Sequence, residues 1–274
     1  MANLEELEKY RKIHMIGIGG VSMSGIAEIL NHWGFTVTGS DANRSEYTDD
    51  LVSHGISVKI GHDFDNVRHA DLVVYTAAIS QEDPELIEAR KLYIPTIERG
   101  DFLGILTKVF NDTICISGTH GKTTTTSMIS SCFLEGKLDP TIQVGAFLNQ
   151  IEGNYRLGNS EYFIIEACEY VESFLKFYPK TELILNIDND HLDYFKDMDH
   201  IILAFKKYVK LLPANGLLVI NSDDPNCSTL AKCTEARTVT FGIKNQNANF
   251  VARNITYNKK RIPYIWCLLQ QYIL

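Results

Sequence analysis

The chain has 274 residues, of which 45% are hydrophobic and 22% are charged. These proportions are close to those of soluble folded domains, so the length predicts one large or two modest domains rather than a disordered chain. The formal net charge of −8 argues against a broad basic surface for nucleic acid. The N-terminus is charged, and no stretch reaches the roughly 18 apolar residues of a membrane span. We therefore expect a cytoplasmic protein without a nucleic-acid or membrane partner.

The first part of the chain alternates short β-branched runs with helical patterns, which is typical of βαβ units and a parallel sheet. The expected elements are the strand Lys12–Ile16, the helix Ser24–Trp33, the strands Phe35–Thr38 and Asp71–Tyr75, and the helix Pro84–Lys91. A polar break at Asn111-Asp112 then predicts a boundary, so residues 1–110 are expected to form one α/β domain.

The same kind of pattern restarts after this break. The expected elements are the strand Thr113–Ser117, the helix Lys122–Leu134, the strands Tyr162–Glu166 and Glu182–Ile187, the helix Asp199–Leu212, and the strands Leu217–Asn221 and Thr238–Ile243. They predict a second α/β domain over residues 111–260. The pattern ends at Arg261, and residues 261–274 are interpreted as an atypical apolar tail.

A glycine-containing segment lies between an expected strand and an expected helix of the second domain. Backbone N–H groups at a helix N-terminus bind phosphates, a lysine there reaches the outer phosphates, and a following hydroxyl can ligate magnesium. The candidate ATP-binding residues are Gly118, Thr119, His120, Gly121, Lys122, Thr123 and Thr124. Ile116 stands where the usual longer form of such a loop has glycine. The alternative is an ordinary turn with an exposed lysine.

A second glycine-rich turn, Gly17–Gly20, follows the first expected strand and opens a helix. Its third glycine is displaced to Gly25, so the spacing misses the usual dinucleotide pattern. Asp41 lies just past the next strand, where NAD enzymes place an acid for the ribose. A structural tight turn remains an alternative, but a ligand with a diphosphate is favoured.

Two further residues are candidates for the same sheet edge as the phosphate loop. Glu166 ends a strand that we expect beside the loop strand, and a carboxylate there can hold a magnesium ion. His191 follows the expected strand Glu182–Ile187. By itself, Glu166 is equally compatible with a solvated acid at the end of a strand, and a lone histidine such as His191 is more often a packed or capping residue than a ligand.

Five motifs together, in order along the chain, resemble the Mur ligases. They are Gly17–Gly25, Gly39–Asp41, Gly118–Thr126, Glu166–Tyr170 with Ser173–Leu175, and Asn186–Tyr194. The resemblance implies a Rossmann-like UDP-sugar-binding domain over 1–110 and an incomplete central ATPase domain over 111–260. It places Gly17, Gly19, Gly20, Ser24 and Asp41 at the UDP-sugar, Lys122 at the ATP phosphates, Thr123 and Glu166 on one Mg²⁺, and His191 on a second.

The resemblance also implies a reaction. ATP converts the carboxylate of UDP-N-acetylmuramate to an acyl phosphate, which the amine of L-alanine attacks, in peptidoglycan precursor synthesis; Lys122, Glu166 and His191 are the implied catalytic residues. Cys168 replaces a frequent Asp of the family, and the segments expected after about Tyr257 are missing, so we expect a truncated and impaired chain. Alternatives are a ligase that attaches a recycled peptide, a non-catalytic nucleotide-binding remnant, and a dinucleotide-dependent oxidoreductase.

Overall fold

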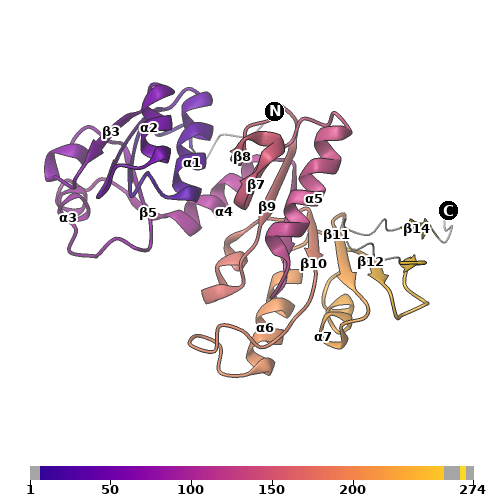
Figure 1. Ribbon diagram of the computed structural model, residues 1–274. Coiled ribbons are helices and arrows are strands. Elements are labelled where there is room, and N and C mark those ends of the chain that lie inside the picture. Colours follow the sequence, from indigo (N-terminus) through magenta and orange to yellow (C-terminus); the bar gives the residue numbers. More distant parts are fainter. Residues whose placement is uncertain (1–6, 256–265, 270–274) are drawn as a thin grey trace. The chain divides into compact units, whose positions relative to one another are not determined.

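The computed structural model describes residues 7–255 and the backbone of 266–269 (Figure 1). The chain divides into two compact units. One comprises the described residues up to Asn111 together with Ser127–Ile164, and the other comprises Asp112–Thr126 together with the described residues from Ile165 onward. The domain boundary that the sequence suggests near residue 110 stays a prediction.

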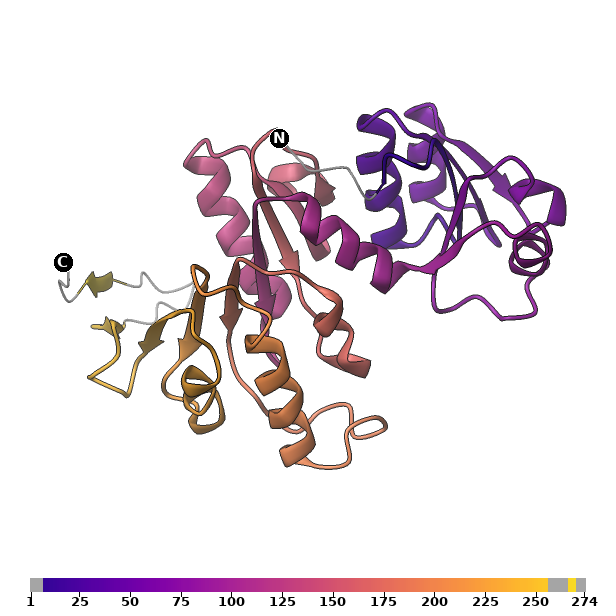
Figure 2. The same ribbon diagram turned by 180° about the vertical axis from the view of Figure 1, so that it is seen from behind.

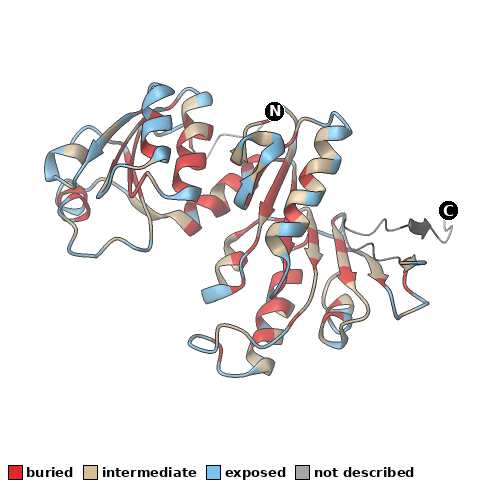
Figure 3. Cartoon of the chain, viewed as in Figure 1, coloured by how far each residue is buried: buried red, intermediate tan, exposed pale blue. Residues whose placement is uncertain are grey.

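The first unit contains a five-stranded sheet with the order β3-β2-β1-β4-β5 among the described residues. Its strands are β1 (Lys12–Ile16), β2 (Thr36–Asp41), β3 (Ser57–Ile60), β4 (Leu72–Tyr75) and β5 (Thr96–Glu98). All neighbouring strands of this sheet are parallel. Ile13 to Ile16 of the central strand are buried, and Figure 3 colours the buried residues of the chain red. The predicted α/β class with a parallel sheet is confirmed.

Helical segments follow each strand of this sheet in the chain. They are α1 (Val21–His32), α2 (Glu46–Ser53), η1 (Phe64–Val67), α3 (Pro84–Lys91) and α4 (Arg99–Val109). The prediction started the first helix too late, because Gly20 already acts as its N-cap in an extended conformation. Helix α2 was not predicted, although Ser45 and Thr48 form a capping box at its start.

A second sheet has the order β14-β13-β12-β11-β10-β6-β9-β7-β8 among the described residues. Its strands are β6 (Asp112–Ser117), β7 (Thr141–Leu148), β8 (Gly153–Arg156), β9 (Tyr162–Glu166), β10 (Thr181–Ile184), β11 (Leu217–Asn221), β12 (Arg237–Gly242), β13 (Phe250–Arg253) and β14 (Trp266–Leu269). Strands β10, β11 and β12 are parallel and lie side by side in both views (Figure 1 and Figure 2). The last strand, β14, is antiparallel to β13, and the rest of the predicted tail 261–274 lies outside the described residues.

The remaining helices are α5 (Lys122–Glu135), η2 (Asn149–Ile151), η3 (Tyr170–Lys176), α6 (Met198–Val209), α7 (Pro225–Ser228) and η4 (Leu230–Cys233). Helix α6 begins after Asp197, whose side chain accepts a hydrogen bond from the His200 N–H. The apolar residues Ile201, Phe205, Tyr208 and Val209 of this helix, and Leu212 just after it, are buried. None of the described helices has the length and apolar character that a membrane span needs.

An unpartnered carboxyl group lies within the second unit. Glu182 of β10 stands opposite Cys115 of β6 and is fully buried. Neither carboxyl oxygen of Glu182 has a hydrogen-bond partner among the described residues. Burial raises the pKa of Glu182 well above its ordinary value, because the charged form loses its hydration. The group is therefore protonated in the folded chain at pH values where the unfolded chain ionises it.

We predict that Glu182→Gln makes the protein more stable than the wild type as the pH rises. The folded wild type holds a proton that the unfolded chain releases above about pH 4.3, so its stability falls by about 1.4 kcal/mol per pH unit until the folded pKa is reached. The variant cannot titrate at this position. Urea unfolding at pH 5 and pH 8 measures the difference, and a difference independent of pH would show that Glu182 is ionised in the fold.

Candidate functional site

The loop between β6 and α5 is held by hydrogen bonds to the segment after β10, chiefly to Asn186. Gly118 and Gly121 have φ values of 131° and 85°, a region that favours glycine. Thr119 N–H donates to the Asn186 carbonyl (3.0 Å), and His120 N–H donates to Asn186 Oδ1 (2.8 Å). The Asn186 side chain donates in return to the His120 carbonyl (3.0 Å). These contacts fix the loop against the segment after β10. Strand β10 ends at Ile184, earlier than the predicted end at Ile187.

Lys122, the first residue of α5, points its ammonium group back into this loop. Its Nζ donates to the carbonyl of Gly118 (2.6 Å) and lies 3.3 Å from that of Thr119. The same nitrogen lies 2.9 and 3.1 Å from the two carboxylate oxygens of Glu169. The side chains of Lys122 and Glu169 are only 16% and 3% exposed, so solvent screens their attraction weakly.

Glu169 is the main residue that the sequence interpretation did not assign to the site. It lay within the motif Glu166–Tyr170, but no pattern indicated that its carboxylate would contact Lys122, which is far away in the sequence. A Glu-x-x-Glu spacing just past a strand that borders a phosphate loop is the only signal that could have singled it out.

Thr123 and Glu166, which the family resemblance assigns to one Mg²⁺, lie within hydrogen-bond distance of each other. The Thr123 hydroxyl donates to Glu166 Oε2 at 3.1 Å, and the chain just after β9 pairs with β6 through the hydrogen bond from Ala167 N–H to the Ile116 carbonyl (2.8 Å). A hydroxyl and a carboxylate oxygen are the hard donors that Mg²⁺ prefers. The donor chemistry of this pair therefore fits a magnesium ion beside the loop.

His191 lies next to Glu169. Its Nε2 is 3.9 Å from Glu169 Oε1, and its ring is 4.7 Å from the ring of Tyr170. The Tyr170 hydroxyl donates to Asp193 (2.8 Å), and this hydrogen bond raises the pKa of Tyr170. An imidazole is a less usual ligand for Mg²⁺ than an oxygen, so the donor chemistry of His191 fits the second ion less well.

The backbone around these side chains is strained. Val171 and Glu172 have φ values of 48° and 54°, and His191 has a φ of 52°. Left-handed backbone is especially unfavourable for a β-branched residue such as Val171. Strain of this kind persists where the surrounding structure imposes it, and it clusters at functional sites.

The glycine-rich turn Gly17–Gly20, predicted to bind the UDP-sugar, is stabilised by a hydrogen bond to Asp41. Gly17 has a φ of 78°, and a Cβ atom there would lie 2.5 Å from Thr76 Cγ2. Gly19 N–H donates to Asp41 Oδ2 at 2.9 Å, and Gly17 N–H donates to the Ser40 carbonyl at 2.8 Å. Asp41 therefore stabilises the turn, and its role toward a ligand stays a prediction, as do those of Gly17, Gly19 and Gly20.

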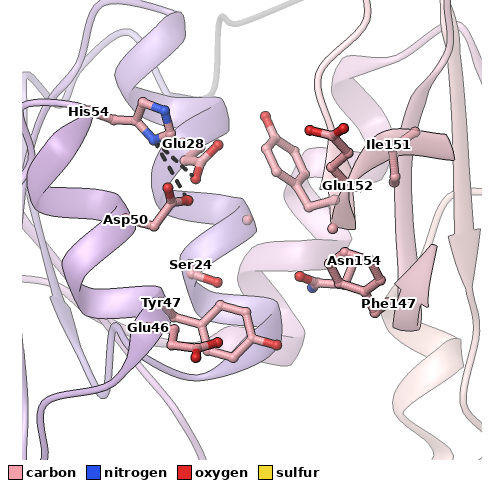
Figure 4. Close-up of a pocket in the computed structure, with 13 residues that line it drawn as sticks. Ser24, Glu28, Glu46, Tyr47, Asp50, His54, Phe147, Ile151, Glu152 and Asn154 are labelled. Atoms are coloured by element: carbon pink, nitrogen blue, oxygen red, sulfur yellow. Dashed lines mark ion pairs between the residues drawn. The ribbon is translucent and has the colours of Figure 1, made fainter. Parts of the chain in front are cut away.

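Ser24 lines a cavity of about 490 Å³ within the first unit (Figure 4). The Ser24 hydroxyl donates to the Val21 carbonyl (3.1 Å). The acidic residues that line the cavity are Glu28, Glu46, Asp50 and Glu152. His54 Nδ1 lies 3.6 Å from Glu28 and 3.8 Å from Asp50, and burial raises the pKa of Glu28. Four acidic side chains around one cavity disfavour an anion there. A contact of Ser24 with a diphosphate stays a prediction.

Comparison with known proteins identifies the family. Residues 116–269 match the family model "Mur ligase middle domain", and residues 12–111 match "Mur ligase family, catalytic domain". The chain belongs to the Mur ligase family. The resemblance predicted from the motifs is confirmed, and the match extends past Tyr257, where the sequence interpretation ended it.

Similar proteins include two curated UDP-N-acetylmuramate–L-alanine ligases. The protein from Acetivibrio thermocellus is 50% identical over 92% of this chain, and that from Clostridium novyi is 51% identical over 92%. The chain spans 54% of the length of each. Among solved structures, the UDP-N-acetylmuramate–alanine ligase of Thermotoga maritima is 31% identical with a TM-score of 0.76, covering 88% of this chain and 54% of that one. A peptide ligase from Neisseria meningitides is 28% identical with a TM-score of 0.82, covering 94% of this chain and 84% of that one.

We predict that Gly17→Ala destabilises the protein more than Gly34→Ala does. Both glycines have a positive φ, but a Cβ at Gly34 meets no atom within 4 Å, whereas one at Gly17 collides with Thr76. The two variants therefore share the backbone strain, and the difference between them, about 1–3 kcal/mol, measures the overpacking of the turn. Urea unfolding gives both values, and equal losses would contradict the close packing of the turn against Thr76.

Proposed function

We propose that this chain carries the UDP-sugar-binding and ATP-binding parts of a ligase that joins L-alanine to UDP-N-acetylmuramate. In this proposal residues 1–110 bind the UDP-sugar and residues 111–260 bind ATP. The observation that carries the proposal is the position of the Lys122 ammonium group at the start of α5, bound to the Gly118 carbonyl and to Glu169. Identity of 50% to curated ligases with this activity supports the choice of substrates.

The phosphate loop supplies the binding energy for ATP in this proposal. The N-terminus of α5 offers backbone N–H groups and the positive end of a helix dipole. Lys122 adds a positive charge in a poorly hydrated position, where its attraction for phosphate is stronger than in water, although the carboxylate of Glu169 offsets part of this charge. Glu169 holds the ammonium group in place, so that little of its conformational freedom is lost when a phosphate arrives.

Thr123 and Glu166 would hold a magnesium ion beside the phosphates, and His191 would serve a second one. A bound magnesium ion supplies charge neutralisation at the phosphate oxygens. The contribution of the chain is to fix the Thr123 hydroxyl and the Glu166 carboxylate 3.1 Å apart at the mouth of the loop.

The proposed chemistry has two steps. A carboxylate oxygen of the sugar attacks the γ-phosphorus of ATP and ADP leaves, which gives an acyl phosphate. The alanine amine then attacks the acyl carbon, phosphate leaves, and the amine nitrogen loses a proton. The work of the protein is positioning and charge neutralisation, because three anionic groups must be brought together. Lys122 is the residue of this chain that neutralises charge during the first step.

Experiments can distinguish two of the alternatives, the recycling ligase and the inactive nucleotide-binding chain, from the proposed ligase. The recycling ligase is supported by the structural similarity to the peptide ligase from Neisseria meningitides, but at 28% identity rather than 50%. A nucleotide-binding chain without activity would bind ATP yet release no ADP when sugar and alanine are added. The oxidoreductase alternative loses its basis, because the chain belongs to a family of ligases.

We predict that Lys122→Gln weakens binding of a non-hydrolysable magnesium–ATP analogue by at least about 30-fold. The loss of a hydrogen-bonded charge partner costs about 2–5 kcal/mol. Calorimetry on the full chain measures the affinity, and circular dichroism verifies that the variant is folded. Lys232→Gln, at an exposed lysine in η4, is the matched control and should bind as the wild type does. Equal affinities for the Lys122 variant and the control would overturn the proposal.

A further inference from the structure

We propose that a cavity on the second face of the five-stranded sheet binds a small phosphate-bearing anion. The cavity has a volume of about 570 Å³ and is lined by residues of β1, β2, β3 and η1 and by His69. Volumes of roughly 300–1,000 Å³ are usual for sites that bind small molecules. The ligase chemistry proposed above uses none of its lining residues.

The topology of the sheet explains why this face is open. Helices α1 and α2 make the first two crossovers, which are right-handed and therefore place both helices on the same face. The crossover from β3 to β4 contains only η1, four residues long, so it leaves the other face of β1, β2 and β3 largely uncovered. Lys12 and His14 lie opposite Thr36 and Thr38 in the register of β1 and β2, and all four line the cavity.

A buried hydrogen-bond network forms the floor of the cavity. His14 is 1% exposed, and its ring nitrogens lie 2.9 Å from Thr38 Oγ1 and 3.2 Å from Glu85 Oε2. Glu85 is fully buried and also accepts hydrogen bonds from Ser40 (2.6 Å) and Asn66 (2.6 Å). The network joins β1, β2, η1 and α3, so the walls of the cavity are fixed relative to one another.

Burying these polar groups costs desolvation free energy, which indicates that the network has a function beyond stabilising the fold. Desolvation of a buried histidine and carboxylate offsets much of their mutual attraction, and an apolar pair of similar size is often as stable. A sheet face that was merely solvated would need no such network. The network instead preorganises the cavity, and preorganised polar walls reduce the entropy lost on binding a ligand.

The charge around the cavity selects an anion. Lys12 and Lys59 line it and make no ion pair with a described residue, and His69 adds a third basic side chain. Asp65, an acidic lining residue, is paired with Arg68 at 2.8 Å. Two lysine ammonium groups at one cavity, in a chain with a net charge of −8, match the doubly charged phosphate group better than a single carboxylate.

The test is a titration of the isotope-labelled full chain with inorganic phosphate, followed through its backbone amide resonances. The chain carries Lys122→Gln, so that the loop proposed for ATP does not contribute. We expect saturable shifts confined to residues 36–38, 57–59 and 66–70. Acetate at the same concentrations should produce smaller shifts, which distinguishes a phosphate site from a general carboxylate site.

The decisive comparison adds Lys12→Gln and Lys59→Gln to this background. We expect the affinity for phosphate to fall at least about tenfold, because two of the attracting charges are lost. Lys232→Gln with Lys244→Gln, at exposed lysines of the second unit, is the matched control and should leave it unchanged. Shifts that do not saturate, or that both pairs of substitutions change equally, would show that the lysines only keep this face of the sheet solvated. Neither result bears on ATP binding at Lys122.

Discussion

The ion pair between Lys122 and Glu169 is the interaction on which the candidate site depends. The ammonium and carboxylate groups lie 2.9 Å apart, and both are almost removed from solvent. Removing one partner of such a pair typically costs about 3–5 kcal/mol, because the other charge is left buried and uncompensated. The pair also sets the geometry of the site, since it links the start of α5 to the segment after β9. Thr123 follows Lys122, and Glu166 ends β9. The ion pair therefore holds these two side chains within hydrogen-bond distance of each other.

The residues with strained backbone lie close to the ion pair between Lys122 and Glu169. Glu169 precedes Val171 and Glu172, both in left-handed conformations, and it lies beside His191, which is also left-handed. A chain free to relax would avoid these conformations. Their presence on both sides of one buried carboxylate indicates that the position of Glu169 is imposed by the fold around it. This is the kind of preorganisation that charge neutralisation at a phosphate requires.

The sequence predicted the parts of the fold whose patterns are local. Strands β1, β9 and β11 and helix α3 have the predicted bounds, because buried β-branched runs and an Asp-Pro helix start are strong local signals. Helix α2 and strands β3 and β7 were missed, since α2 is short and polar, β3 is largely exposed at an edge, and only half of β7 is buried. The candidate phosphate loop was recognised for a similar reason, because its glycines and lysine are adjacent in the sequence, and its role toward a phosphate stays a prediction. The contacts of Asn186 and Glu169 with the loop were not predicted, because they join residues that are far apart in the chain.

The most direct test of the account locates a metal ion experimentally. Manganese(II) can replace magnesium in many phosphate sites and broadens the amide resonances of nearby residues, so the labelled full chain would be titrated with manganese–ADP. The account predicts selective broadening at Thr123, Glu166 and Glu169, and none at the cluster of Glu28, Asp50 and His54, whose ligand atoms also lie close together. Broadening at that cluster, with Thr123 and Glu166 unaffected, would contradict the assignment of the nucleotide site.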